Sequence, residues 1–266
     1  MPFTLSHAAA AWPFRKTRLD FSALLTGCFI PDAPYFLFFI PHGFKGHTLR
    51  GMFEFDLPAA LVALWLFHTL IQPVLSIFLP QGVRKRMTAD GNKFSFMPIS
   101  HLALIMLSIL LGAATHIFWD SFTHQYRWGY RHWSFLRLGV SLPVVGNMEM
   151  YKLLQYGSSV AGLVFIAIWI WHWYRTTRPA GKAAPEPFTQ SRRRLLAFAM
   201  PTAAICGGLW RAYELVKIPD TIKPTVHFTV DALVTAITVF GAELLVCGLM
   251  LRWIHARSRR FSTNYL

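Results

Sequence analysis

Long apolar runs alternate with short polar segments along the whole chain. Five runs reach the roughly 20 residues that a helix needs to cross a bilayer, and they cover residues 57–79, 99–119, 153–174, 195–215 and 228–254. A sixth run, residues 21–40, is interrupted by Pro31-Asp32-Ala33-Pro34, which disfavours one straight span. The pattern predicts an all-α, polytopic integral membrane helical bundle of about five to six spans.

The first 30 or so residues predict a short N-terminal helical hairpin. Residues 6–14 and 21–30 are two short apolar segments, and the basic and polar residues 15–20 lie between them. Because an antiparallel hairpin returns the chain to its starting level, His7 and Asp32 would lie side by side at its open end. In the alternative, the N-terminal segment lies flat in the cytoplasm and His7 is remote from Asp32.

The composition excludes a soluble domain. Hydrophobic residues make up 54% of the 266 residues and charged residues only 14%, whereas soluble domains carry about 25% charged residues. The mean hydropathy is +0.39. The cysteines Cys28, Cys206 and Cys247 fall singly inside apolar runs, where they are expected to pack as small hydrophobic side chains. They offer no metal-binding Cys pair.

The charge pattern indicates a multi-pass protein of an inner or plasma membrane. The net charge is +14, but the Lys and Arg residues form short clusters between the apolar runs and make no basic domain for nucleic acid. When each run crosses once, most of these clusters fall on one side, which the positive-inside rule assigns to the cytoplasm together with both termini. Membrane lipid is therefore the expected partner.

A polar segment divides the chain into three predicted regions. Residues 181–194 contain two prolines and a run of arginines, a composition typical of a linker. We therefore expect a membrane core over residues 1–178, a cytoplasmic linker over 179–194, and a two-helix membrane extension with a basic tail over 195–266.

The strongest candidate chemistry lies near the end of the second long run. His116, Asp120 and His124 recur every fourth residue, so they form one stripe on a helix. Ionisable groups at this depth are costly unless they are paired or liganded, and imidazole with carboxylate binds divalent ions such as Zn, Mn or Fe. The alternative is a His–Asp hydrogen bond that caps the helix end.

Three residues that precede this stripe in the sequence are candidates for the same metal site. Asp32 follows an apolar helix between two prolines, although Asp is also common where a helix stops. His47 lies in a glycine-containing loop that emerges on the same face as the His116 helix end; alternatively it is a solvated loop histidine. His7 joins this set in the hairpin arrangement. The predicted metal ligands are therefore His7, Asp32, His47, His116, Asp120 and His124.

The segment from Arg127 to Trp133 alternates basic and aromatic side chains. Such a segment suits the membrane interface, with Trp at headgroup level and Arg facing phosphate. It equally suits binding of an anionic substrate over the metal, in which case Arg131 and His132 are the expected contacts.

The last two runs contain ionisable groups of their own. Arg211 and Glu214 lie near one end of the first, and Asp231 lies near the facing end of the second. We expect a structural ion pair among them. Glu243 lies deeper, and a carboxylate at that depth is a functional candidate.

Several motifs resemble a known family. MPFTLSHAAA, GCFIPDAPYFL, FDLPAAL, LGAATHIFWDSFTH, RHW and YKLLQYGSS occur in this order over about the first 175 residues. Together they resemble a bacterial membrane family catalogued as domain of unknown function number 4184. More distantly, the chain is similar to predicted membrane-bound metal-dependent hydrolases, which show an N-terminal His, a Pro-Asp motif, a His-containing stretch and a final His…Asp helix. The matching positions here are His7, Pro31-Asp32, His47-Thr48, His116 and Asp120.

These observations support two hypotheses for the function. The first is a membrane-embedded metal-dependent hydrolase in which metal-activated water attacks a lipid or lipid-linked phosphoester. No nucleophile elbow and no phosphate-binding glycine loop is present in the sequence, which excludes the commoner hydrolytic alternatives. The second is a non-enzymatic membrane protein, a small transporter or assembly factor, whose His/Asp group is a structural or translocated-ion site.

Overall fold

The fold is that of a multi-pass helical membrane protein. The computed structural model describes residues 3–39, 45–87, 94–143, 146–179, 188–218 and 222–263. Six helical stretches among them are long and apolar enough to cross a membrane, which confirms the predicted architecture. They are Phe21–Phe38, Leu49–Phe78, Ile99–His132, Met150–Thr176, Gln190–Val216 and Pro224–Ile254.

The chain forms two compact units. Unit 1 comprises Met1–Ala33, Gly43–Leu64 and Lys93–Thr177, and unit 2 comprises Pro34–His42, Trp65–Asn92 and Arg178–Leu266. Residues 180–187 of the predicted linker lie outside the described residues, and its last five residues, 190–194, begin a long helix. The three predicted regions stay a prediction.

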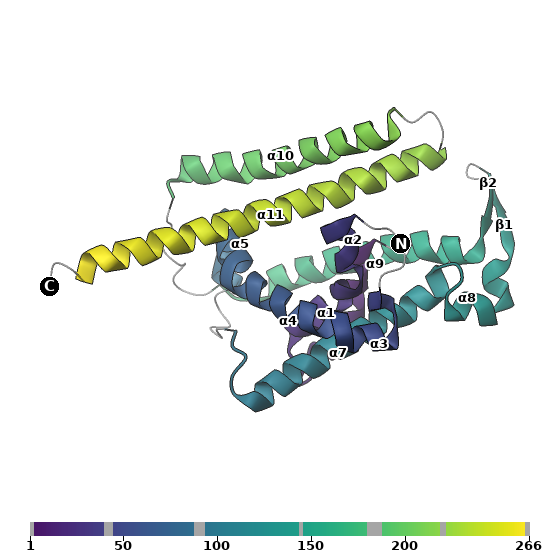
Figure 1. Ribbon diagram of the computed structural model, residues 1–266, viewed down its shortest axis with the longest axis horizontal. Coiled ribbons are helices and arrows are strands. Elements are labelled where there is room, and N and C mark those ends of the chain that lie inside the picture. Colours follow the sequence, from purple (N-terminus) through teal and green to yellow (C-terminus); the bar gives the residue numbers. More distant parts are fainter. Residues whose placement is uncertain are drawn as a thin grey trace. The chain divides into compact units, whose positions relative to one another are not determined.

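Unit 1 is built from helices and one small hairpin of strands (Figure 1). Its longest elements are α7 and α9, and the other segments are short. In chain order the elements are η1 (Thr4–Phe14), α1 (Phe21–Phe29), η2 (Ile30–Asp32), η3 (Lys45–His47), α3 (Leu49–Gly51), η4 (Met52–Asp56), α4 (Leu57–Leu66, which continues into unit 2), α7 (Ile99–Thr123), α8 (Trp128–His132), η6 (Ser134–Arg137), β1 (Gly139–Leu142), β2 (Gly146–Glu149) and α9 (Met150–Thr176).

The predicted N-terminal hairpin is confirmed. η1 is a 3₁₀ helix, and it packs against both α1 and α9. The carboxylate of Asp20 caps α1 by accepting a hydrogen bond from the Ala23 amide at 2.7 Å, which satisfies one of the free donors at a helix start. The Asp20 amide in turn donates to the Ser108 hydroxyl at 3.0 Å. The turn of the hairpin is thereby tied to α7.

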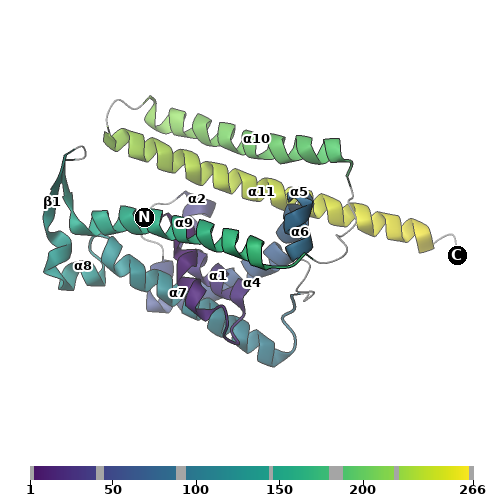
Figure 2. The ribbon, with the colours of Figure 1, turned by 180° about the vertical axis from the view of Figure 1, so that it is seen from behind.

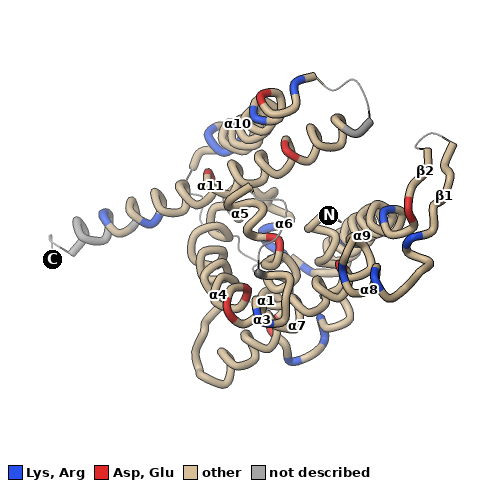
Figure 3. Tube along the Cα trace, turned by 45° about the vertical axis from the view of Figure 1, so that its right-hand side comes forward, with Lys and Arg blue, Asp and Glu red and all other residues tan. Residues whose placement is uncertain are grey.

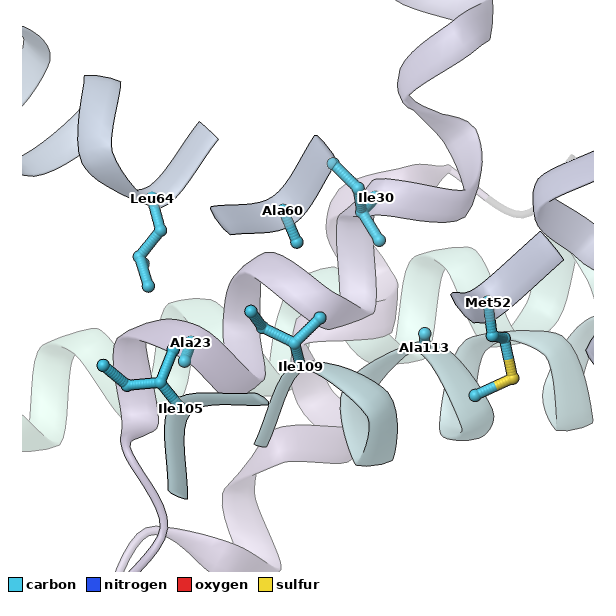
Figure 4. Close-up of a cluster of buried hydrophobic side chains, with 8 residues drawn as sticks. All are labelled: Ala23, Ile30, Met52, Ala60, Leu64, Ile105, Ile109 and Ala113. Carbon is cyan, nitrogen blue, oxygen red and sulfur yellow. The ribbon is translucent and has the colours of Figure 1, made fainter. Parts of the chain in front are cut away.

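Two glycines bring α1 and α7 into close contact. A Cβ at Gly27 would lie 2.2 Å from the carbonyl oxygen of Ile109, and one at Gly112 would lie 2.3 Å from that of Leu24. Because small residues let helix backbones approach closely in membranes, this crossing fixes the end of α1 against the middle of α7. The crossing lies beside the largest apolar core of unit 1 (Figure 4), which buries Ala23, Ile30, Met52, Ala60, Leu64, Ile105, Ile109 and Ala113.

The two strands were not predicted from the sequence. β1 and β2 pair antiparallel, with Gly139 opposite Glu149 and Leu142 opposite Gly146. The Met150 amide donates to the Leu138 carbonyl at 2.9 Å, which closes the hairpin directly onto the start of α9. Strands of four residues leave too short an alternation to stand out beside runs of span length.

Unit 2 is dominated by two long helices. α10 (Gln190–Val216) and α11 (Ile222–Thr263) lie side by side along their length in Figures 1 and 2. A Cβ at Gly208 would lie 2.3 Å from the Ala232 carbonyl oxygen, so this contact also depends on a glycine. The remaining elements are most of α2 (Ala33–Phe38), then η5 (Phe67–Ile71), α5 (Gln72–Phe78) and α6 (Gln81–Met87).

The charged residues follow the membrane pattern. Figure 3 shows the long helices drawn mostly without charge, and in α9 the cations Lys152 and Arg175 lie near the two ends. The predicted ion pair is confirmed, since Arg211 Nη1 lies 3.8 Å from Asp231 Oδ1. Glu214 pairs instead with Lys217 at 3.5 Å. The cytoplasmic placement of the termini and the type of membrane stay predictions.

Candidate metal centre

Four of the predicted ligands converge in unit 1. Asp32 is the last residue of η2, and His47 is the last residue of η3. His116 and Asp120 lie one turn apart on α7. One ligand atom from each of these four side chains lies within 4.8 Å of all the others, so the cluster can hold a metal ion.

The spacing within this cluster is that of ligands around a common ion. His47 Nε2 lies 3.4 Å from Asp32 Oδ1 and 3.5 Å from Asp120 Oδ2. His116 Nε2 lies 3.6 Å from Asp32 Oδ1 and 3.4 Å from Asp120 Oδ2. Charge-assisted hydrogen bonds are shorter, about 2.7–2.9 Å. By contrast, two atoms that each bind a tetrahedral ion at about 2.1 Å are roughly 3.4 Å apart. The donor set therefore fits a divalent cation.

Two of these atoms are buried without a hydrogen-bond partner. His116 is fully buried and Asp32 is 2% exposed, and neither His116 Nε2 nor Asp32 Oδ1 makes a hydrogen bond. An unsatisfied buried polar atom costs about 1–3 kcal/mol, and more when it is charged. A cation among them removes this cost.

Hydrogen bonds outside the cluster orient its ligands. The carbonyl oxygen of Cys28 lies 2.8 Å from His116 Nδ1. Because a carbonyl only accepts, Nδ1 is the protonated nitrogen and the lone pair of Nε2 points toward the carboxylates. The Thr4 hydroxyl donates to Asp32 Oδ2 at 2.7 Å, which leaves Oδ1 for the cluster. These contacts fix the side chains of His116 and Asp32 before any ion binds.

The other two predicted ligands flank the cluster. His7 stacks on His116 with ring centroids 3.9 Å apart, and its Nε2 lies 3.5 Å from Asp120 Oδ1. Burial, with the adjacent His116, lowers the pKa of His7 to about 4, so its imidazole is neutral at physiological pH. His124 Nδ1 lies 3.4 Å from the same Asp120 oxygen. Both reach the centre through Asp120, and their role as ligands stays a prediction.

Asp56 belongs to this region and was missed by sequence reasoning. It is fully buried in η4, and neither carboxylate oxygen has a hydrogen-bond partner. A Cβ at Gly46 would lie 2.7 Å from Asp56 Oδ1, and the Asp56 charge interacts with those of His47, His116 and Asp32. An acidic residue just before an apolar run resembles an ordinary helix start, so the sequence signal was weak.

A small polar cavity opens beside the cluster. It has a volume of about 230 Å³ and is lined by His47 and Asp120 together with Arg127 and Trp128. Arg127 Nη1 donates to the His47 carbonyl oxygen at 3.4 Å. The basic and aromatic segment thus contributes Arg127 to the site.

The predicted substrate contacts lie on the surface of this segment. Arg131 and His132 are exposed, and the His132 ring stacks on Trp128 with centroids 4.8 Å apart. Their role in substrate binding stays a prediction.

The chain matches the family described as Domain of unknown function (DUF4184) over residues 1–251. No curated protein and no solved structure matches it. Only the residues of the site itself therefore indicate its chemistry.

Proposed function

The chain belongs to the DUF4184 family, as its motifs predicted, and because that description states no activity, we propose a function from the site: a membrane-embedded, metal-dependent hydrolase. Its divalent ion is held by Asp32, His47, His116 and Asp120. One observation carries this proposal. Four ligand atoms from three separate segments, three of them on buried residues, share the spacing of a coordination sphere, and two of them have no other partner.

The chemistry assigned to the ion is general. When bound, a divalent cation lowers the pKa of a coordinated water and polarises a phosphoryl or acyl oxygen. The chain itself supplies a neutral imidazole, His7, next to Asp120, and a second imidazole, His124, on the same carboxylate oxygen. We assign to these two histidines the transfer of protons to and from the reacting groups.

Three of the four ligands lie in segments with the length and apolarity of membrane spans, which favours a lipid or lipid-linked phosphoester. Asp32, His116 and Asp120 all lie in stretches long and apolar enough to cross a bilayer. Arg127 places a guanidinium in the polar cavity, and a guanidinium suits the oxygens of a phosphate. An anionic ester group held at bilayer level is the substrate that matches both features.

A second candidate function is ion translocation or a structural ion site without catalysis. It is supported by the helix break at Pro31, where α1 gives way to the short turn η2 next to the cluster. Irregular backbone within membranes often lines an ion-binding cavity. This alternative predicts a bound ion but no chelator-sensitive hydrolysis.

Metal analysis of the detergent-purified protein tests the proposal. The comparison is between wild type, Asp120→Asn and the matched control Asp231→Asn, which changes a carboxylate that pairs with arginine. We expect stoichiometric metal in wild type and control, loss of metal in Asp120→Asn, and phosphatase or esterase turnover that a chelator abolishes. Metal-free wild-type protein would overturn the proposal. Bound metal without turnover on any phosphoester or carboxylic ester would favour the second candidate.

A further inference from the structure

A second, much larger cavity is lined by His7. It has a volume of about 1030 Å³ and lies between η1, α7 and α9, which pack against one another in unit 1 (Figure 2). No Asp, Glu, Lys or Arg lines it, and most of its wall is Ala, Gly, Leu, Phe and Trp. The volume is near the upper end of the range for ligand sites, about 300–1,000 Å³.

His7 and Asp120 connect this apolar cavity with the polar one. His7 lines the apolar cavity, is 5% exposed, and its Nε2 has no hydrogen-bond partner. The same nitrogen lies 3.5 Å from Asp120 Oδ1, and Asp120 lines the polar cavity. The polar cavity therefore touches the ligand cluster directly, and the apolar cavity touches His7, which contacts the cluster ligand Asp120.

The apolar cavity faces the hydrocarbon region of a bilayer. Two of its three walls, α7 and α9, are membrane-spanning stretches. Phe118 on α7 is 63% exposed and Leu153 on α9 is 36% exposed, so the apolar rim is open to the surroundings of the protein. In a membrane those surroundings are lipid chains.

We propose that this cavity binds the hydrocarbon chain of a long-chain phosphate monoester while Arg127 contacts its phosphate from the polar cavity. The proposal rests on the function proposed above and names its substrate class. The chain then ends at His7 and the phosphate lies at Asp120, and because these two side chains are 3.5 Å apart, the ester bond comes to lie at the metal centre. Water then adds to phosphorus as the P–O ester bond breaks, and the leaving oxygen takes the proton, which yields inorganic phosphate and a long-chain alcohol.

A glycine in the cavity wall allows a clean test. A Cβ at Gly157 meets no atom within 4 Å, so Gly157→Trp fills the cavity without disturbing the backbone. Gly241 on α11 is equally open and lies in unit 2, which makes Gly241→Trp the matched control. Ala161→Leu is a smaller change in the same cavity wall, in case the tryptophan prevents folding.

Two substrates distinguish the contribution of the hydrocarbon chain from that of the phosphate. Hexadecyl phosphate in detergent micelles carries a long chain, and p-nitrophenyl phosphate carries none. We expect Gly157→Trp to lower kcat/KM for hexadecyl phosphate by roughly tenfold or more, because several methylene groups lose their buried site. Turnover of p-nitrophenyl phosphate, metal content and the Gly241→Trp control should change less than about twofold. Arg127→Gln should lower kcat/KM for both substrates alike.

The possible outcomes distinguish this inference from the proposed function. Unchanged hexadecyl phosphate turnover in both Gly157→Trp and Ala161→Leu would overturn the chain site and leave the hydrolase intact. Equal loss of turnover for both substrates, or loss of metal, in both cavity variants would also overturn the chain site, because the substitutions would then be disturbing the metal centre itself. Wild-type protein that binds metal but hydrolyses neither phosphate ester would overturn this substrate class, whereas metal-free wild-type protein would overturn the proposed function.

Discussion

The two units solve the same electrostatic problem in different ways. Each places carboxylates among apolar helices, where an unpaired charge is costly. In unit 2, Asp231 lies 3.8 Å from a guanidinium nitrogen of Arg211, so the charge is balanced within the protein. In unit 1, Asp32 and Asp120 face the imidazoles of His47 and His116.

The difference shows where an external ion is needed. A guanidinium is permanently cationic, so the pair in unit 2 is complete by itself. An imidazole is neutral or cationic depending on pH and is an excellent metal ligand when neutral. With neutral histidines, two carboxylates in one buried cluster leave negative charge that a divalent cation balances. Asp231 in unit 2 thus has a structural role, whereas Asp32 and Asp120 in unit 1 are placed to bind an ion.

The largest effect should follow the loss of a ligand in unit 1. His116→Gln removes a fully buried imidazole, and we expect metal affinity to fall by at least about a hundredfold, beyond the usual effect of changes to ligand-orienting neighbours. His172→Gln, an exposed histidine on α9, should have no effect on affinity. Calorimetric titration of the detergent-purified, metal-free protein measures both, and equal affinity in the two variants would contradict the assignment.

Removing the carboxylate of Asp56 should weaken metal binding but stabilise the metal-free protein. Asp56→Asn keeps the shape of the side chain and removes a charge that has no hydrogen-bond partner. We expect metal affinity to fall by about tenfold, because the Asp56 charge acts on His47, His116 and Asp32. The metal-free variant should melt at a higher temperature than wild type, since an unpaired buried charge is destabilising. A lower melting temperature would indicate that Asp56 has a structural partner instead.

Metal affinity should also depend on pH. Burial lowers the pKa of His47, but the attraction of the adjacent Asp120 and Asp32 carboxylates outweighs this effect and raises the pKa above its ordinary value. A metal must displace that proton at any pH below the raised pKa, so affinity should rise by about tenfold per pH unit as pH increases toward it, and level off above it.

Two variants check this origin of the pH dependence. His47→Gln should flatten the slope near neutral pH. His7→Gln should leave the slope in place, because the His7 pKa of about 4 keeps that ring neutral throughout this range. A slope that survives in His47→Gln would exclude His47 as its source.

The smallest effect should come from the self-contained pair of unit 2. Asp231→Asn and Arg211→Gln each break this contact, and we expect losses of unfolding free energy of about 1 kcal/mol. Metal content and turnover should remain those of wild type. Thermal unfolding followed by circular dichroism measures the stability, and a loss of metal in either variant would show that the units are coupled.

Local features of the chain were predictable from the sequence. The five to six spans, the N-terminal hairpin and the stripe of His116, Asp120 and His124 follow from run length and helical period, which act between near neighbours. The Arg211–Asp231 pair was also predictable, because two consecutive helices must bring facing ends together. Run length, helical period and the connection of consecutive segments suffice for all of these.

The composition of the site was decided by tertiary structure. The close crossing at Gly27 and Gly112 brings Asp32 against His116, and the 3₁₀ geometry of η1 puts His7 on the same cluster. Burial without a partner, which singles out Asp56, is a property of the packed state. Likewise, Arg127 reaches the polar cavity while Arg131 is exposed, a choice set by where α8 packs. A sequence specifies which groups are available, but only packing determines which of them share one buried volume.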